Sequence, residues 1–268
     1  MISKHHQFIV NEMKNNFYRT IWISDLHIGS TQCQADVLLD FLKYNDSEKL
    51  YLVGDIIDFW ALSKKMYWPR EHNTVIQKIL RKARLGTHII YIPGNHDENV
   101  RDYDSYIFGD IIVKNSDIHT TADNKRFLIV HGDEYDTIAQ HHQWIAKLGN
   151  SGYDILIELN RVIKAVRRYF GVNSHFSLAA YVKYKVKNAV QFISDYEENI
   201  VHTLKKENVD GVICGHIHHA EIKEIDQFLY INTGDFVESC TAIVEHFDGR
   251  LELKYWTEVS PEDDIDED

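Results

Sequence analysis

Cysteine is scarce in this chain of 268 residues. Only Cys33, Cys214 and Cys240 occur, and no two of them form a Cys-x-x-Cys pair. This usage argues against a disulfide framework and fits a reducing compartment. We therefore expect a cytoplasmic protein.

Long hydrophobic runs are also lacking. No stretch of the sequence approaches the roughly 18 consecutive apolar residues that a membrane-spanning helix needs. The beginning of the chain, Met1 to Lys14, is polar and contains no apolar segment of signal-peptide length. The sequence thus predicts a protein that does not cross a bilayer.

Positive charge is in short supply, with 29 Lys and Arg against 41 Asp and Glu and a net charge of −12. This balance disfavours a broad nucleic-acid surface, so a nucleic acid is not an expected partner. Acidic residues crowd the chain end at 262–268, and we expect 259–268 to be a disordered acidic tail. The segment 161–187 reverses the sign, because it carries basic side chains and no Asp or Glu.

Side chains that commonly bind metal ions follow five runs rich in Val, Ile or Leu. These blocks read TIWISDLH at 20–27, LYLVGDIID at 50–58, IIYIPGNHDE at 89–98, FLIVHGDE at 127–134 and GVICGHIHH at 211–219. A single His or Asp beside a strand end is usually a cap or a turn residue. Five such blocks in order instead predict a rigid metal site at the ends of buried strands. The candidate ligands are Asp25, His27, Asp55, Asn95, His131, His216 and His218.

The hydrophobic periodicity predicts an α/β domain. Strand patterns at about 19–24, 49–53, 88–92, 126–130 and 210–214 alternate early with helical patterns at about 33–44 and 73–85. Later strand patterns follow one another across short gaps and should pair as antiparallel strands. They lie at about 220–224, 228–232, 241–246 and 250–256. We assign 1–135 and 209–258 to this core.

Between two of the metal blocks, residues 136–208 show a helical period in place of the strand signal. Apolar residues from Ile155 to Val166 fall on one stripe, with Arg161, Lys164 and Arg167 largely off it. We expect a helical cap inserted into the core. Its basic helices could contact an anionic membrane surface or the acyl chains of a lipid, or they could be an ordinary exposed polar face.

The five blocks resemble the pattern of the calcineurin-like metallophosphoesterase superfamily: Asp-x-His, Gly-Asp-x-x-Asp, Gly-Asn-His-Asp/Glu, His and Gly-His-x-His. The resemblance implies a four-layer αββα sandwich with metals at the strand ends. It assigns the first metal to Asp25, His27, Asp55 and His218. It assigns the second metal to Asp55, Asn95, His131 and His216, so that Asp55 is shared.

The same resemblance implies a metal-dependent phosphoric ester or anhydride hydrolase. Two divalent ions can hold a hydroxide between them as the nucleophile and neutralise the phosphoryl oxygens. His96 matches the family histidine that contacts the reacting phosphoryl group, and Asp58 matches the carboxylate that orients it, which predicts a catalytic His96–Asp58 dyad. Mixed His, carboxylate and amide ligands suit Mn²⁺, Fe²⁺, Co²⁺ and Zn²⁺, and Mn²⁺ is our choice.

A narrower resemblance links Asp25 to Glu98, HGDEYD at 131–136 and the helical insertion to the UDP-2,3-diacylglucosamine diphosphatase group of lipid A biosynthesis. It implies a lipid-linked pyrophosphate substrate and a peripheral place on the inner face of the membrane. Members of that group commonly carry Arg where this chain has His96, the residue usual in the wider superfamily. Candidate substrate contacts are Arg70, Arg161, Lys164 and Arg167.

Three alternatives remain open at this point. A general phosphodiesterase or phosphomonoesterase for small soluble substrates would use the same metals, with the cap only restricting access. A nuclease is weakened by the acidic balance of the chain. A non-catalytic binding scaffold, as in the retromer subunit of this fold, would have lost ligands that are all present here.

Overall fold

The computed structural model of the protein describes residues 16–135 and 196–257. It divides into a larger unit, residues 1–132 and 201–268, and a smaller unit, residues 133–200; we call the larger one the core unit. In the smaller unit, the 3₁₀ helix η2 (Asp133–Tyr135) accepts a hydrogen bond at the Tyr135 carbonyl from Asn199 Nδ2, at 3.2 Å. Most of the predicted cap at 136–208, and the predicted tail at 259–268, lie outside the described residues.

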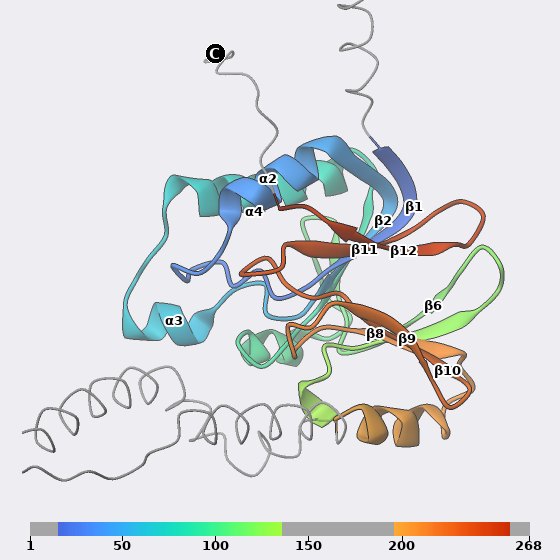
Figure 1. Ribbon diagram of the computed structural model, residues 1–268. Helices are drawn as coiled ribbons and strands as arrows, with labels where there is room; N and C mark the ends of the chain where they lie inside the picture. Colours follow the sequence, from blue (N-terminus) through green and yellow to red (C-terminus); the bar gives the residue numbers. More distant parts are fainter. Residues whose placement is uncertain (1–15, 136–195, 258–268) are drawn as a thin grey trace, which may run out of the picture. The chain divides into compact units, whose positions relative to one another are not determined.

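The core unit contains a seven-stranded sheet with strand order β12-β11-β1-β2-β3-β5-β4 (Figure 1). Its central pairs β1–β2, β2–β3 and β3–β5 are parallel, and the outer strands β4, β11 and β12 pair antiparallel. The strands are β1 (Asn16–Ile23), β2 (Asn45–Val53), β3 (His88–Ile92), β4 (Ile107–Phe108), β5 (Ile111–Val113), β11 (Thr241–Glu245) and β12 (Leu251–Tyr255).

A second sheet has five strands in the order β6-β7-β8-β10-β9. Its centre, β7–β8–β10, is parallel, and β6 and β9 pair antiparallel at the two edges. The strands are β6 (Asp117–Thr120), β7 (Arg126–Ile129), β8 (Gly211–Cys214), β9 (Glu221–Ile225) and β10 (Phe228–Asn232).

The four last strands, β9 to β12, form two separate antiparallel pairs. β9 and β10 pair antiparallel in the five-stranded sheet, and β11 and β12 pair antiparallel in the seven-stranded sheet. Residues 233–240, between β10 and β11, cross from one sheet to the other. The predicted antiparallel pairing is therefore confirmed within each hairpin, and the two hairpins belong to different sheets.

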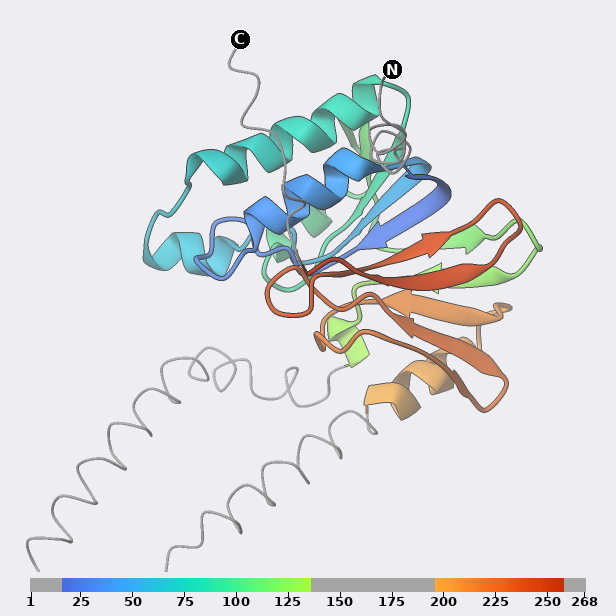
Figure 2. The same ribbon diagram turned by 45° about the horizontal axis from the view of Figure 1, so that its top comes forward.

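Helices cover the outer face of the seven-stranded sheet. They are α2 (Ala35–Tyr44) and α4 (Arg70–Arg84) (Figures 1 and 2). The shorter α3 (Phe59–Lys64) and the 3₁₀ helix η1 (Glu98–Tyr103) follow β2 and β3 along the chain. In α4, the buried residues Val75, Ile79 and Ala83 recur every four positions, so one face of the helix packs inward. Among the described residues, no helix combines the length and apolar composition that crossing a membrane requires.

Alternation along each central strand builds two separate apolar cores. In β1, Ile21 and Ile23 join the core beneath the helices, whereas Trp22 joins the core between the two sheets. β2 repeats the pattern, with Leu50 and Leu52 on the helix side and Tyr51 on the other. A strand buried on both faces reads as a continuous apolar run, which is why these strands were visible in the sequence. The α/β sandwich is confirmed.

Candidate metal centre

The parallel register brings the strand ends level with one another. Ile23 lies opposite Leu52, and Val53 lies opposite Ile92. Residues that follow β1, β2 and β3 therefore emerge at the same edge of the seven-stranded sheet. In the five-stranded sheet, β7 and β8 are parallel neighbours in the same way, which brings together the segments that follow them. Each of the seven candidate ligands lies on one of these segments.

The backbone is strained at most of the candidate ligands. Non-glycine residues rarely adopt positive φ angles, and such angles cost energy that the surrounding structure must supply. Clusters of them are typical of functional sites. The candidate ligands with positive φ are Asp25 (52°), His27 (49°), Asp55 (53°), His216 (72°) and His218 (53°).

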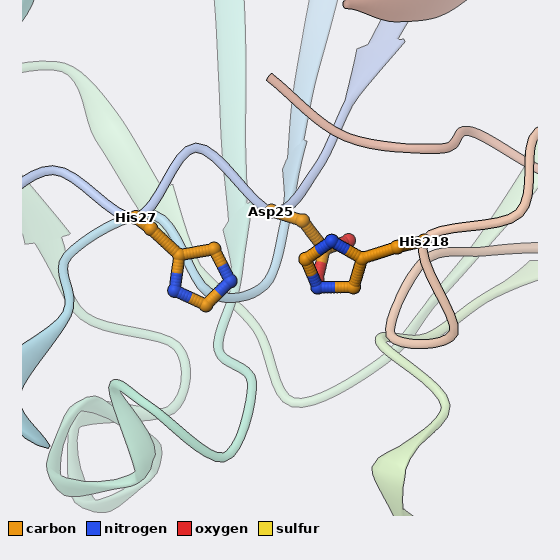
Figure 3. A group of neighbouring side chains, drawn as sticks. All are labelled: Asp25, His27 and His218. Carbon is orange, nitrogen blue, oxygen red and sulfur yellow. The ribbon is translucent and has the colours of Figure 1, made fainter. Parts of the chain in front are cut away.

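One group of potential ligands consists of Asp25, His27 and His218, whose donor atoms lie within 4.8 Å of one another. His218 Nε2 is 3.3 Å from Asp25 Oδ1. Figure 3 shows the Asp25 carboxylate beside the His218 ring, with the His27 ring facing the same space from the other side. Asp25 Oδ1 and His27 Nε2 are buried and have no hydrogen-bond partner among the described residues. Buried polar atoms are rarely left in that state, so these two atoms suit a cation between them.

Asp55 lies between this group and a second one. Its Oδ2 is 3.8 Å from His27 Nε2, whereas its Oδ1 is 3.5 Å from His131 Nε2. Asp55, Asp25 and His131 also have donor atoms within 4.8 Å of one another. The two oxygens of one carboxylate thus face two different histidines.

The two remaining candidate ligands, Asn95 and His216, lie on the loops that follow β3 and β8. Asn95 Oδ1 is buried and has no hydrogen-bond partner among the described residues. The backbone N–H of His216 donates to Asp25 Oδ2 at 3.1 Å, and the His216 ring lies 5.3 Å from that of His131. Amide oxygen, imidazole nitrogen and carboxylate together suit borderline divalent ions. The residues present therefore fit the metals that the sequence predicted.

The electrostatics of the group favour a cation. Burial alone would lower the pKa of His218, but the neighbouring carboxylates of Asp25 and Asp235 raise it to about 9. Burial likewise opposes charge on His96, yet Asp58 and Asp55 raise its pKa above the ordinary value. The carboxylates therefore create a negative potential that stabilises positive charge in a buried place.

Asp58 holds two histidines at once. Its Oδ1 is 2.9 Å from His96 Nδ1, and its Oδ2 is 3.1 Å from His27 Nδ1. Oδ1 also accepts a hydrogen bond from the backbone N–H of Ala61 at 2.7 Å, which caps α3. Burial would raise the pKa of Asp58, but hydrogen bonds from the two histidines lower it below its usual range. Asp58 is therefore ionised and can orient both rings, and the structure brings the predicted pair His96 and Asp58 together.

Asp97 and Asp235 support the ligand loops. Asp97 is fully buried and accepts hydrogen bonds from the backbone N–H groups of Gly94 and Ile56, at 2.5 and 2.8 Å. Asp235 accepts three backbone N–H bonds from 237–239, and its Oδ2 lies 3.5 Å from His218 Nδ1. In the sequence, either residue could equally have been a turn cap. The structure shows that Asp97 braces the loops after β2 and β3 against one another.

Three contributors to the site escaped the sequence reasoning. The Trp60 ring packs on the His96 ring with centroids 4.1 Å apart. Ser24 Oγ donates to the Asp25 carboxylate, and Tyr91 OH donates to Asp97 Oδ2. Ser24 precedes Asp25 directly and Trp60 lies two residues after Asp58, but nothing in a strand pattern marks a serine or a tryptophan as part of a metal site.

Gly94 and Gly54 let the ligands approach the backbone. A Cβ at Gly94 would overlap Asp55 Oδ1 and lie 2.7 Å from His131 Cδ2. A Cβ at Gly54, whose φ is +77°, would overlap the His131 ring. Both positions therefore exclude any side chain while the candidate ligands keep their places.

The predicted substrate contacts are less well defined. Arg70 is exposed at the start of α4, where its carbonyl accepts a hydrogen bond from Thr74 Oγ1. Arg161, Lys164 and Arg167 lie outside the described residues. Their roles in binding a substrate stay predictions.

Sequence comparison gives the family. The calcineurin-like phosphoesterase family matches residues 18–220. A UDP-2,3-diacylglucosamine hydrolase of Haemophilus influenzae (strain PittGG) is 24% identical over 250 residues, which cover 87% of this chain and 95% of that protein. A protein of the same name from Proteus mirabilis (strain HI4320) is 22% identical over 225 residues, covering 77% and 85%.

Among solved structures, an archaeal phosphodiesterase aligns over 88% of this chain and 98% of its own, with 15% identity and a TM-score of 0.42. A likeness at that level carries no conclusion about this chain. The family match does, because residues 18–220 contain all five metal blocks. The chain belongs to the calcineurin-like phosphoesterase family and is a metal-dependent phosphoester hydrolase.

Proposed function

We propose that the chain hydrolyses a phosphate ester or pyrophosphate with two divalent ions, and that its substrate is lipid-linked. The observation that supports two ions rather than one is the position of Asp55. Its two carboxylate oxygens face His27 on one side and His131 on the other, at 3.8 and 3.5 Å. Asp25, His27, Asp55 and His218 would hold the first ion, and Asp55, Asn95, His131 and His216 the second. Mn²⁺ is the ion we expect at both places.

Two such ions would neutralise the non-bridging oxygens of a bound phosphoryl group and make water a stronger nucleophile at neutral pH. The protein supplies the rest. His96 lies at the edge of the cluster, with Nε2 3.9 Å from Asp55 Oδ2 and Nδ1 turned to Asp58. Asp58 fixes the ring and stabilises its charged form, so His96 can donate a proton from Nε2 to the leaving oxygen.

The relatives point to the kind of substrate. Those from Haemophilus and Proteus are named for hydrolysing UDP-2,3-diacylglucosamine, a nucleotide-linked lipid, and the chain covers 95% and 85% of their lengths. We infer a pyrophosphate that joins a nucleotide to an acylated sugar. The segment 136–208 would then act as a cap over the acyl chains, and the protein would work at the inner face of the membrane.

A second candidate function is supported by His96 itself. This position carries His, as is usual in the wider superfamily, rather than the Arg of the narrower group. A His that protonates a leaving oxygen suits esters with poor leaving groups, such as small soluble phosphodiesters and phosphomonoesters. Substrate comparison separates the two candidates.

The test uses the full chain, treated with chelator and then reloaded with Mn²⁺. Turnover is measured on UDP-2,3-diacylglucosamine, bis(p-nitrophenyl) phosphate and 2′,3′-cyclic nucleotides. We expect UMP release from the lipid-linked substrate with the highest kcat/KM. Asp55→Asn should abolish turnover of all three, and Asp36→Asn, an exposed carboxylate in α2, should abolish none. A higher kcat/KM for the soluble esters would reject the lipid-linked substrate, and full activity of Asp55→Asn would reject the shared ligand.

A further inference from the structure

Residues 59–70, which form α3, its connection to α4 and the first residue of α4, are basic. They read FWALSKKMYWPR and contain Lys64, Lys65 and Arg70 but no Asp or Glu. The whole chain, in contrast, has a net charge of −12. We call residues 59–70 the α3 segment. It forms one margin of the core unit in Figures 1 and 2.

The α3 segment also exposes large apolar side chains. Met66 is 76% exposed, Tyr67 38% and Trp68 37%, and Phe59 at its beginning is 36% exposed. Trp and Tyr beside Lys is the composition that prefers the interface between water and lipid, where rings lie among headgroups and basic side chains reach the phosphates. The rings of Tyr67 and Trp68 are thus only partly packed.

The segment is held firmly in this exposed position. The rings of Tyr67 and Trp68 meet the buried ring of His72 edge-on, at 5.6 and 6.1 Å. His72 Nδ1 in turn accepts a hydrogen bond from the backbone N–H of Gly29 at 3.0 Å. Leu62 lies directly against Gly29, so closely that a Cβ there would meet it. The exposed side chains are therefore presented by a fixed scaffold.

The same segment leads directly into the metal centre. Asp58 caps α3, the backbone N–H of Phe59 donates to the His96 carbonyl at 3.1 Å, and the Trp60 ring packs on the His96 ring. If Met66 and Trp68 contacted a lipid surface, only the short helix α3 would thus separate that surface from the metal centre. A lipid-linked substrate could reach the site from that surface without fully entering water.

We propose that the α3 segment docks on an anionic lipid surface, with Met66 and Trp68 among the headgroups and Lys64 and Lys65 on lipid phosphates. We choose an anionic lipid surface as the partner because its negative charge complements the basic side chains of the α3 segment, whereas the chain as a whole is acidic. The proposal rests on the proposed function only for the lipid-linked nature of the substrate. The predicted contact of 136–208 with membrane is a separate matter.

A second cluster of exposed aromatic rings in the core unit lacks the basic side chains of the α3 segment. Tyr103, Tyr106 and Phe108 are 50%, 61% and 50% exposed, and their rings contact one another. This cluster is accompanied by Asp102, Asp104 and Asp110. It therefore offers a matched control: similar exposed rings, opposite charge. Phe108→Ser removes one of them without touching the α3 segment.

The first experiment measures co-sedimentation of the full, Mn²⁺-loaded chain with vesicles of phosphatidylcholine, with and without phosphatidylglycerol. We expect binding to the mixed vesicles. Lys64→Gln/Lys65→Gln should weaken it about 30-fold, since each basic residue near an anionic surface strengthens binding about fivefold. Phe108→Ser should bind like the wild type. Failure of the wild type to bind, equal binding by the double variant, or an equal loss in Phe108→Ser overturns the proposal.

The second experiment locates the contact. The chain has five tryptophans, and lipids brominated near the headgroup quench only those that reach the bilayer. Quenching should fall in Trp68→Phe, while binding, supported by the phenyl ring, remains. If Trp68→Phe is quenched as strongly as the wild type, another part of the chain makes the contact and the proposal is wrong.

Hydrolysis of bis(p-nitrophenyl) phosphate without vesicles separates this proposal from the proposed function. The variants at Lys64, Lys65 and Trp68 should turn over this soluble ester like the wild type. If they do and vesicle binding is unchanged, only the docking surface is refuted. If the wild type binds vesicles through Trp68 but hydrolyses no phosphoester, only the proposed function is refuted.

Discussion

Asp97→Asn tests the brace between the ligand loops. Asp97 Oδ1 accepts hydrogen bonds from the backbone N–H groups of Gly94 and Asp55, at 2.5 and 3.3 Å. Its Oδ2 accepts from the N–H groups of Ile56, at 2.8 Å, and Ile57, at 3.4 Å, and Tyr91 OH donates to it as well. Every position around the carboxylate is therefore taken by a donor.

An asparagine of the same shape cannot serve all of these donors. Whichever way its amide turns, the NH₂ group faces two backbone N–H groups that then lack an acceptor. Leaving a buried donor unsatisfied costs about 1–3 kcal/mol, so the variant should be destabilised by about 2–6 kcal/mol. For a chain of this size, the melting temperature should fall by roughly 5–20 °C. Because the ligand loops loosen, Mn²⁺ affinity should also drop about 10- to 100-fold.

Thermal unfolding followed by circular dichroism gives the stability, and titration calorimetry with Mn²⁺ gives the affinity. Asp36→Asn is the control, because Asp36 is exposed on α2 and should change the free energy of unfolding by no more than about 0.5 kcal/mol. A variant Asp97→Asn that melts and binds Mn²⁺ like the wild type would show that the brace is unimportant, and the reasoning would be refuted.

Three further predictions concern the site and the core. His96→Asn should lower kcat on a poor leaving group by about 10²- to 10⁴-fold with metal content unchanged, and wild-type turnover would disprove its role as proton donor. In Gly94→Ala, the added Cβ should displace the Asp55 carboxylate. The metal content should then fall while the circular dichroism spectrum stays native, and full metal content would contradict the close contact between Gly94 and Asp55. Hydrogen bonds from His119, Ala122 N–H and Thr20 outweigh burial and lower the pKa of Glu245 below 4.5. The ionised Glu245 therefore stabilises the folded protein fully above pH 4.5, and this stabilisation is lost as the pH falls through the lower pKa of the folded state. The difference in the free energy of unfolding between the wild type and Glu245→Gln should then become smaller from pH 5.5 to pH 3. A difference that stays constant over this range would contradict the prediction.

The positions of the candidate ligands at the strand ends could be predicted because the core strands are buried on both faces. Trp22 and Ile23 belong to different apolar cores, so the run Ile21–Ile23 is continuously apolar and its end, two residues before Asp25, is plain in the sequence. The same holds for the run that ends at Val53, before Asp55. Parallel strands then bring their ends to one edge, which is all that the metal prediction required.

Other features depend on contacts between distant segments. The crossing between sheets at 233–240 gives no periodic signal, so the separation of β10 from β11 was not visible. β4 has only two residues, both exposed, and lacks the apolar run that marks a strand. The brace at Asp97 needs Tyr91 and the loop at Asp55 folded around it. The exposure of Trp68 was equally hidden, because a single sequence does not distinguish a packed ring from one presented to a partner.

The central claim is that Asp55 joins two cations. Crystals of the Mn²⁺-loaded chain, measured at the manganese absorption edge, test it most directly by anomalous scattering. The account predicts two anomalous peaks on opposite sides of the Asp55 carboxylate, one beside His27 and His218 and the other beside Asn95 and His131. A single peak at saturating Mn²⁺, or two peaks that leave Asp55 without contact to either ion, would contradict it.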